Sequence, residues 1–212
     1  MGAAVKRVLL LLCDGVEIFE AAAFHDVLGW ASEYGSEPIE VVPVGLRPEI
    51  VCTFGLRVAA ARPLGEVEAD DFDALALPGG FVEYGFDECA LSAPVAALIR
   101  RFDELGRPIA AICTGAVPVA ASGVLDGRQA TTYQLLGGHR RRQLAGFGAE
   151  VVDQPLVTDG VVTTSAGPST AAEVAFRLLE QLTGAANASH IRHLMGFSQP
   201  IASDQPLGQE GS

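Results

Sequence analysis

The feature that most constrains the fold is a repeated alternation of short apolar runs with longer segments of helical periodicity. The apolar runs, rich in aliphatic and β-branched residues, occupy positions 5–13, 39–45, 74–80 and 108–113. Segments with helical spacing occupy 17–34, 93–105, 114–125, 135–146 and 168–183. This order is typical of βαβ units around a largely parallel sheet. The sequence therefore predicts an α/β fold.

Other segments are predicted to form hairpins, edge strands or a tail. Hairpins are expected at 51–63, with Gly55 in the turn, and at 149–166, turning at Asp159-Gly160. Segment 128–133 is predicted to be a further strand. We expect one domain over 1–184, followed at 185–212 by a short docking helix and a disordered tail.

Charge and hydropathy limit the partners that the chain is expected to have. The formal net charge of -12 disfavours nucleic acid and anionic membranes, which both bind clustered cations. The one basic cluster, Arg140 to Arg142 beside His139, is predicted to be a solvated helix face. Acidic residues follow the apolar N-terminal run at once, and no apolar stretch approaches the ~20 residues of a membrane span. We therefore expect a soluble, cytoplasmic protein.

Among four cysteines, Cys113 has the sequence context of a nucleophile. Cys13, Cys52 and Cys89 are predicted to be inert small apolar residues, and the spacing of all four gives no metal site. Cys113 lies where the apolar run 108–113 passes without a spacer into a helical segment. At such a turn the helix N-terminus favours the thiolate, so Cys113 is expected to titrate well below the ~8.5 of a free thiol.

Four motifs occur in an order and spacing that resemble the DJ-1/PfpI superfamily. They are LPGG at 77–80, AAICTGA at 110–116, ATTY at 130–133 and TSAGPSTAAEVAF at 164–176. The resemblance covers about residues 6 to 184. It implies a three-layer sandwich with a mainly parallel central sheet, flavodoxin-like or DJ-1-like.

The resemblance also implies roles for individual residues. A carboxylic acid at the start of the first long helix shares a hydrogen bond with the cysteine, and Glu20 has that position, with Glu17 one turn earlier. Backbone N–H groups of Gly80 and Thr114 are implied as an oxyanion hole. No cofactor or metal is implied, and homodimers are common in the superfamily. The first helix has an apolar face with Phe24, Val27, Leu28 and Trp30. This face is either a dimer surface or part of the core of one chain.

Two departures from the pattern bear on the chemistry. Active relatives often carry a histidine directly after the cysteine or at the end of the ATTY strand, whereas this chain has Thr114 and Tyr133 there. The obvious general base is therefore missing, which argues against peptidase or deglycase activity. The CTG elbow resembles isocyanide hydratases and the ligand domains of AraC-type regulators. Tyr133 is expected either to donate a hydrogen bond through its hydroxyl or to be a half-buried core residue. His139 is expected at the surface, or else as a second source of the missing imidazole.

The sequence thus predicts a small-molecule hydratase or hydrolase of isocyanide-hydratase type, with Cys113 as nucleophile and Glu20 as proton shuttle. A glyoxalase-like enzyme is the alternative within this class. A redox or ligand sensor that acts through Cys113 without turnover is the alternative outside it. A small-molecule ligand and a second copy of the chain are the expected partners.

Overall fold

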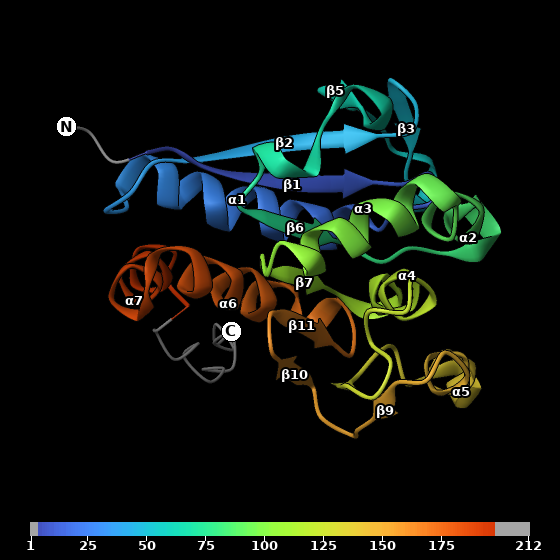
Figure 1. Cartoon of the computed structure of the whole chain (residues 1–212). Coiled ribbons are helices and arrows are strands. Elements are labelled where there is room, and N and C mark those ends of the chain that lie inside the picture. The colour runs from blue at the N-terminus through green and yellow to red at the C-terminus, as the bar shows by residue number, and fades with distance from the viewer. Residues whose placement is uncertain (1–3, 198–212) are drawn as a thin grey trace, which may run out of the picture.

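A seven-stranded sheet forms the centre of the computed structural model, which describes residues 4–197 (Figure 1). Its strand order is β10-β11-β7-β6-β1-β2-β5. All neighbouring pairs are parallel except β10 and β11, which form a hairpin. The bounds are β1 Lys6–Leu12, β2 Ile39–Gly45, β5 Arg62–Pro63, β6 Ala74–Leu77, β7 Ile109–Ala111, β10 Leu156–Asp159 and β11 Val162–Ser165.

Helices cover both faces of this sheet (Figure 1). One face carries α1 (Ile18–Tyr34), α6 (Ala171–Thr183) and α7 (Ala185–Leu194). The other carries α2 (Phe86–Ala90), α3 (Ala93–Glu104), α4 (Ala116–Ala121) and α5 (His139–Gly146). The expected three-layer α/β sandwich is thereby confirmed, and α7 is the short helix expected after Gly184.

The side chains of β1 show how the two cores are divided. Val8, Leu10 and Leu12 are buried against the α1 and α6 side, whereas Leu9 and Leu11 are buried against the α3 side. Successive side chains of a strand point to opposite faces, so a run that is apolar throughout needs cover on both. This accounts for the unbroken run of leucines in β1.

The arrangement of strands fixes the place of a binding site. Strand β1 pairs with β2 on one side and with β6 on the other, and β7 follows β6. The order of the strands reverses at β1, and ligands of open α/β sheets bind beyond the carboxyl ends of the strands at such a point. The segments that follow β1, β6 and β7 therefore meet at one edge of the sheet.

The smaller predicted elements differ from the structure in length and place. The expected hairpin at 51–63 is β3 (Glu49–Val51) paired with β4 (Arg57–Ala59). The strand expected at 128–133 reduces to β8 (Gln129–Ala130), which pairs with β9 (Glu150–Val151) outside the main sheet. Helix α5 begins at His139 instead of 135, because Gly137 and Gly138 have left-handed backbone conformations that end the preceding turn.

The proposed dimer surface on the first helix is wrong for three of its four residues. Phe24, Val27 and Leu28 are buried in the core between α1 and the sheet. Trp30 alone is exposed, and it packs on Tyr34. Among residues 4–197, no helix is both long and apolar enough to cross a membrane.

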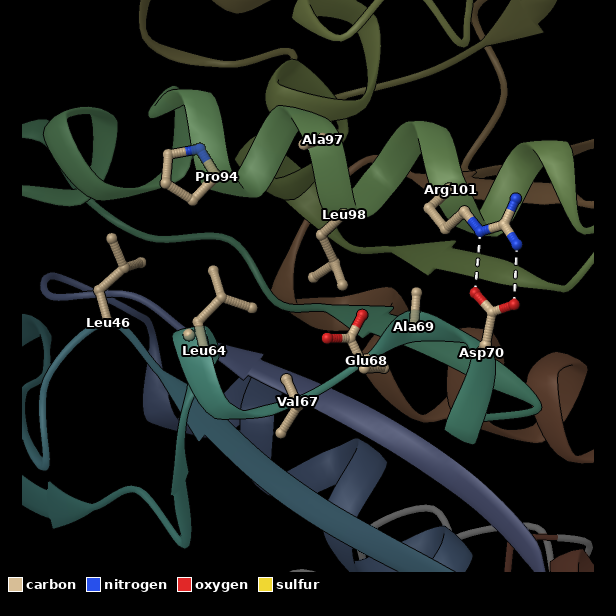
Figure 2. A pocket seen from close by; sticks show the side chains of 11 residues that line it. Leu46, Leu64, Val67, Glu68, Ala69, Asp70, Pro94, Ala97, Leu98 and Arg101 are labelled. Carbon is tan, nitrogen blue, oxygen red and sulfur yellow. Dashed lines mark hydrogen bonds and ion pairs between the residues drawn. The ribbon is translucent and has the colours of Figure 1, made fainter.

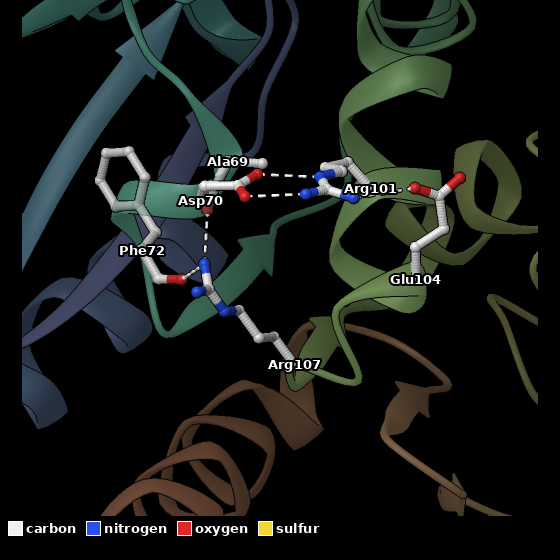
Figure 3. A network of polar contacts seen from close by, with 6 residues as sticks. All are labelled: Ala69, Asp70, Phe72, Arg101, Glu104 and Arg107. Carbon is white, nitrogen blue, oxygen red and sulfur yellow. Dashed lines mark hydrogen bonds and ion pairs between the residues drawn. The ribbon is translucent and has the colours of Figure 1, made fainter.

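A polar network holds the segment that precedes β6 against helix α3 and against the turn after α3 (Figure 3). Arg101 binds the Asp70 carboxylate with two hydrogen bonds of 2.8 and 2.7 Å. Arg107 donates to the backbone oxygens of Ala69 and Phe72. These contacts hold the loop that enters β6, and β6 in turn leads to Gly79 and Gly80.

Candidate active site

Cys113 occupies a sharp turn between β7 and α4. Its φ of 57° is left-handed, a conformation that costs a non-glycine residue roughly 1 kcal/mol or more. A short 3-10 turn, Cys113–Gly115, leads directly into α4. The predicted elbow is therefore present, with its strain borne by the candidate nucleophile.

Close packing of the elbow against β6 depends on Gly115. A Cβ at this position would lie 2.5 Å from the Leu77 carbonyl oxygen and 3.0 Å from that of Pro78. Both are backbone atoms and have no room to move away. The absence of a side chain at Gly115 therefore lets the elbow pack tightly against β6.

Glu20 lies in the first turn of α1 and is completely buried. Its Oε2 accepts a 2.6 Å hydrogen bond from the Gly79 N–H. Its Oε1 has no hydrogen-bond partner in the part of the chain that the structure describes. A buried carboxylate oxygen without a partner is costly, whereas a protonated carboxyl avoids that cost. The geometry thus favours a proton on Glu20.

The titration of Glu20 agrees with its burial. The pKa of Glu20 is raised to about 8, mainly by desolvation. The Gly79 hydrogen bond lowers this pKa in part, and the charge of Glu17 raises it further. Burial also raises the pKa of Glu17, which lies half-buried at the site. At neutral pH Glu20 is therefore mainly a neutral acid.

The pKa of Cys113 is raised, whereas its position at the turn predicts a lowered pKa. The side chain is 5% exposed, and burial is the largest cause that raises its pKa; the Glu20 charge raises it further. The Thr114 N–H lowers the pKa by a hydrogen bond to the sulfur, but burial outweighs it. The expectation of a thiol that titrates well below 8.5 is wrong for this conformation. At neutral pH both Cys113 and Glu20 are therefore mainly protonated.

The cysteine opens on a cavity of about 210 Å³. Its lining combines apolar side chains with a few polar groups: Glu17, Gly80, Phe81, Val82, Glu83, Cys113, Thr114, Tyr133, Leu136, His139, Arg140 and Pro168. Segments that follow β1, β6 and β7 meet here, as the strand order requires. The size suits a small molecule and excludes a folded partner.

Two of the residues weighed as substitutes for the missing histidine line this cavity together. Tyr133 is half-buried, with its ring against Gly167, and His139 lies at the N-terminus of α5. Neither side chain is hydrogen-bonded to Cys113 among the described residues. The structure brings both near the site and leaves their roles open.

Arg140 is the functional candidate that sequence reasoning missed. It was predicted to lie on a solvated face, but it is 5% exposed and pairs with Asp87 through bonds of 2.9 and 3.1 Å. The prediction fits Arg142, which is exposed, and fits Arg141 in part. The pattern of three consecutive arginines carries no signal of this, because the partner Asp87 is distant in sequence.

One of the implied oxyanion donors, the Gly80 N–H, is bonded to the Thr114 side-chain hydroxyl in this structure. The Gly80 N–H donates to Thr114 Oγ1 at 2.8 Å, and the same hydroxyl donates to the Gly80 carbonyl at 2.8 Å. A substrate oxygen that uses the Gly80 N–H must take the place of the hydroxyl. The two residues are adjacent, as the resemblance implied.

Other candidate groups lie away from this site. His25, His190 and His193 are exposed on α1 and α7. A larger cavity of about 420 Å³ between α3 and the segment before β6 contains no cysteine or histidine, and its carboxylates, Glu68 and Asp70, are exposed (Figure 2). It lacks the buried acid and the nucleophile that the smaller cavity has.

Known proteins match this chain over most of its length. A model described as the DJ-1/PfpI family matches residues 6–181. Protein dj-1beta of Drosophila melanogaster is 33% identical over 84% of this chain and 90% of its own length. Deglycase TK1284 of Thermococcus kodakarensis is 32% identical over 76% of this chain and 90% of its own. The crystal structure of the Drosophila protein superposes with a TM-score of 0.80 at 30% identity, covering 91% of this chain and 98% of that one.

Proposed function

Because this chain belongs to the DJ-1/PfpI family, we propose that it is a cysteine-dependent enzyme acting on small reactive carbonyl compounds, of which 2-oxoaldehydes are the first choice. One observation supports this most strongly. A strained cysteine opens on a small cavity, directly beside a buried acid that has an unpartnered oxygen. Such a pair can add a thiol to an electrophilic carbon and move the proton.

The proposed reaction begins with addition of Cys113 to the aldehyde carbon. The Sγ–C bond forms, the carbonyl π bond breaks, and the thiol proton passes through the Glu20 carboxyl to the new alkoxide. The product is a hemithioacetal. The C–H proton of the former aldehyde carbon then moves to the neighbouring carbon and the hydroxyl proton moves to the neighbouring oxygen, which gives a thioester. Water hydrolyses the thioester to a 2-hydroxy acid and the free thiol. These reaction steps need no external oxidant.

Substrate polarity fits the lining of the cavity. Phe81, Val82 and Leu136 supply apolar surface, and Arg140 brings a buried cation whose charge is shared with Asp87. A 2-oxoaldehyde combines a short apolar chain with two carbonyl oxygens that accept hydrogen bonds. Tyr133 and His139 are the side-chain donors available to the second oxygen.

Isocyanide hydration is the second candidate. The specific observation in its favour is Tyr133, which lines the cavity where many active relatives carry a histidine. Attack on an isocyanide carbon requires a proton and water but no departing amine. The relatives named above are a DJ-1 protein and a deglycase, which ranks this reaction below carbonyl addition.

A parallel assay distinguishes the two reactions. The purified protein is incubated with methylglyoxal or with an alkyl isocyanide, and products are followed by proton NMR as a 2-hydroxy acid or a formamide. We expect 2-hydroxy acid from the wild type, none from Cys113→Ser, and a large loss with Glu20→Gln. Equal turnover by wild type and Cys113→Ser would reject the proposal for either substrate.

A homodimer is proposed on a different surface from the one first considered. Phe54 is 78% exposed and stacks at 5.8 Å on Phe81 and 6.0 Å on Tyr84, close to the cavity that Phe81 lines. An exposed aromatic cluster of this kind is typical of an interface. Analytical ultracentrifugation of wild type and Phe54→Asn tests it, because Asn tolerates the left-handed backbone at this position. Monomeric wild type would reject the dimer.

A further inference from the structure

Two of the cysteines expected to be inert lie together on the side of the sheet opposite Cys113. Cys13 follows β1 and Cys89 lies in α2, and both belong to the core beneath α3, whereas Cys113 belongs to the core beneath α1. Close packing of the turn after β1 on the start of α2 brings them together. A Cβ on Gly15 would lie 2.8 Å from the Phe86 nitrogen, and the Phe81 N–H donates to the Gly15 carbonyl.

The two sulfur atoms have unequal surroundings. Cys89 packs against the core cluster that contains Cys13, and the two side chains lie close enough to shift each other's pKa. Contact with Cys13 lowers the pKa of Cys89, whereas contact with Cys89 and burial raise the pKa of Cys13. Because Cys89 is also the better solvated of the two sulfurs, we assign it as the one that ionises first.

Access from solvent is also unequal. Cys89 is partly exposed and lines a cavity of about 440 Å³ together with Asp14, Arg47 and Tyr84. The Arg47 guanidinium lies there, 3.4 Å from the Asp14 carboxylate, and its charge also favours the Cys89 thiolate. Cys13 is 2% exposed and does not line the cavity. A small oxidant that enters the cavity meets Cys89 first and Cys13 directly behind it.

We propose that Cys89 and Cys13 form a second thiol site, in which a hydroperoxide oxidises the pair to a reversible disulfide. The Cys89 thiolate attacks the terminal peroxide oxygen, the O–O bond breaks, and the leaving hydroxide or alkoxide takes a proton. Cys89 becomes a sulfenic acid. The Cys13 sulfur then attacks the Cys89 sulfur, its proton leaves with the hydroxyl group as water, and the S–S bond forms. A thiol reductant reverses the reaction.

Cys52 provides an internal control. It is fully buried, and burial raises its pKa, with no cysteine among the groups that shift it. It therefore shares the low exposure of Cys13 without the reactive neighbour. A disulfide should link Cys13 to Cys89 and leave Cys52 reduced.

The first experiment uses the wild-type protein and hydrogen peroxide. After oxidation, free thiols are alkylated in denaturant and the chain is cleaved after glutamate, which places each of the four cysteines on a separate peptide. We expect peptide 1–17 linked to peptide 89–104, a link that dithiothreitol removes, while Cys52 is alkylated. An oxidised chain in which Cys13 remains alkylated, or whose disulfides join two chains, would overturn the proposal.

Variants test the order of events. In a Cys113→Ser background, which removes the nucleophile of the proposed enzyme, the same link should form. With Cys13→Ser added, Cys89 should accumulate a sulfenic acid that dimedone traps, and with Cys89→Ser added, Cys13 should stay reduced. Oxidation of Cys13 at an unchanged rate in the absence of Cys89 would refute the assigned roles. Far-ultraviolet circular dichroism confirms that each variant is folded before it is scored.

Discussion

Glu20 makes stability depend on pH in a way that the structure allows one to calculate. The pKa of this carboxyl rises from an ordinary value of 4.5 to about 8 in the folded chain, mainly through burial. Between these pH values the folded state keeps the proton that the unfolded state has released. Its contribution to stability is therefore fully present below about pH 4.5 and is lost as the pH rises through 8.

The size of this loss follows from the two pKa values. Each tenfold change in proton affinity is worth about 1.4 kcal/mol, so the contribution that disappears is on the order of 5 kcal/mol. That is a large part of the 5–15 kcal/mol by which domains are usually stable. The Glu20→Gln variant keeps an oxygen for the Gly79 N–H but has no proton to lose. Relative to wild type, the variant should gain stability as the pH rises.

The assay is urea unfolding of wild type and Glu20→Gln at several pH values between about 4.5 and 9, followed by circular dichroism and the fluorescence of Trp30. The difference in free energy of unfolding should move in favour of Gln by several kcal/mol across that range. Glu17→Gln is a matched control, because its half-exposed carboxyl is also raised in pKa but is better solvated. A wild-type to Gln difference that is constant with pH would refute the buried, protonated acid.

The same variant reports on the nucleophile. The Glu20 charge is one of the causes that raise the pKa of Cys113, so Glu20→Gln should speed alkylation of Cys113 above about pH 8, where wild-type Glu20 is ionised. Mild peroxide should also give a different yield of Cys113 sulfinate. Equal alkylation rates and equal sulfinate yields would transfer the role of the acid to Glu17.

Three further outcomes are expected. Gly115→Ala should destabilise the fold by roughly 1–3 kcal/mol, measured by urea unfolding, because its Cβ meets the Leu77 oxygen at 2.5 Å; an unchanged midpoint would contradict the packing. Asp87→Ala should cost about 3 kcal/mol, because it leaves Arg140 buried without its carboxylate, and stability equal to wild type would show that the remaining 2.9 Å bond to Gln143 is enough for Arg140. Tyr133→His should raise deglycation by up to roughly 100-fold if an imidazole is what the site lacks. Wild-type deglycation of a few turnovers per second would contradict that reasoning.

Periodicity predicted the long elements well and the short ones poorly. Strand β1, helix α1 and helix α3 extend over nearly the predicted residues, because β1 is a short unbroken apolar run and the two helices have apolar residues at helical spacing over several turns. The start of α5 was missed, since two glycines with positive φ interrupt the backbone where side-chain pattern still suggests a helix. The two-residue pairing of β8 depends on β9 and not on any local signal.

The site was predictable where its residues share one local pattern. Cys113 could be identified from the abrupt strand-to-helix junction. Helical spacing places Glu17 and Glu20 on the same face as the buried Phe24, so it does not separate the two acids; Glu20 was identified through the family resemblance. Burial of Arg140 depends on Asp87, which the fold brings from another helix, so no local pattern reveals it.

The oxyanion role proposed for the Gly80 N–H would let the site distinguish a substrate from its transition state. The Gly80 N–H is already satisfied by the Thr114 hydroxyl at 2.8 Å. A neutral carbonyl oxygen gains little by displacing one good acceptor with another, whereas a developing alkoxide forms a stronger, charge-assisted bond. The Thr114 hydroxyl therefore competes for the Gly80 N–H, and the charged oxygen displaces it more readily than the neutral carbonyl oxygen does. The bond to the Gly80 N–H would then contribute little to binding of the substrate and more to binding of the transition state, which favours turnover over tight substrate binding.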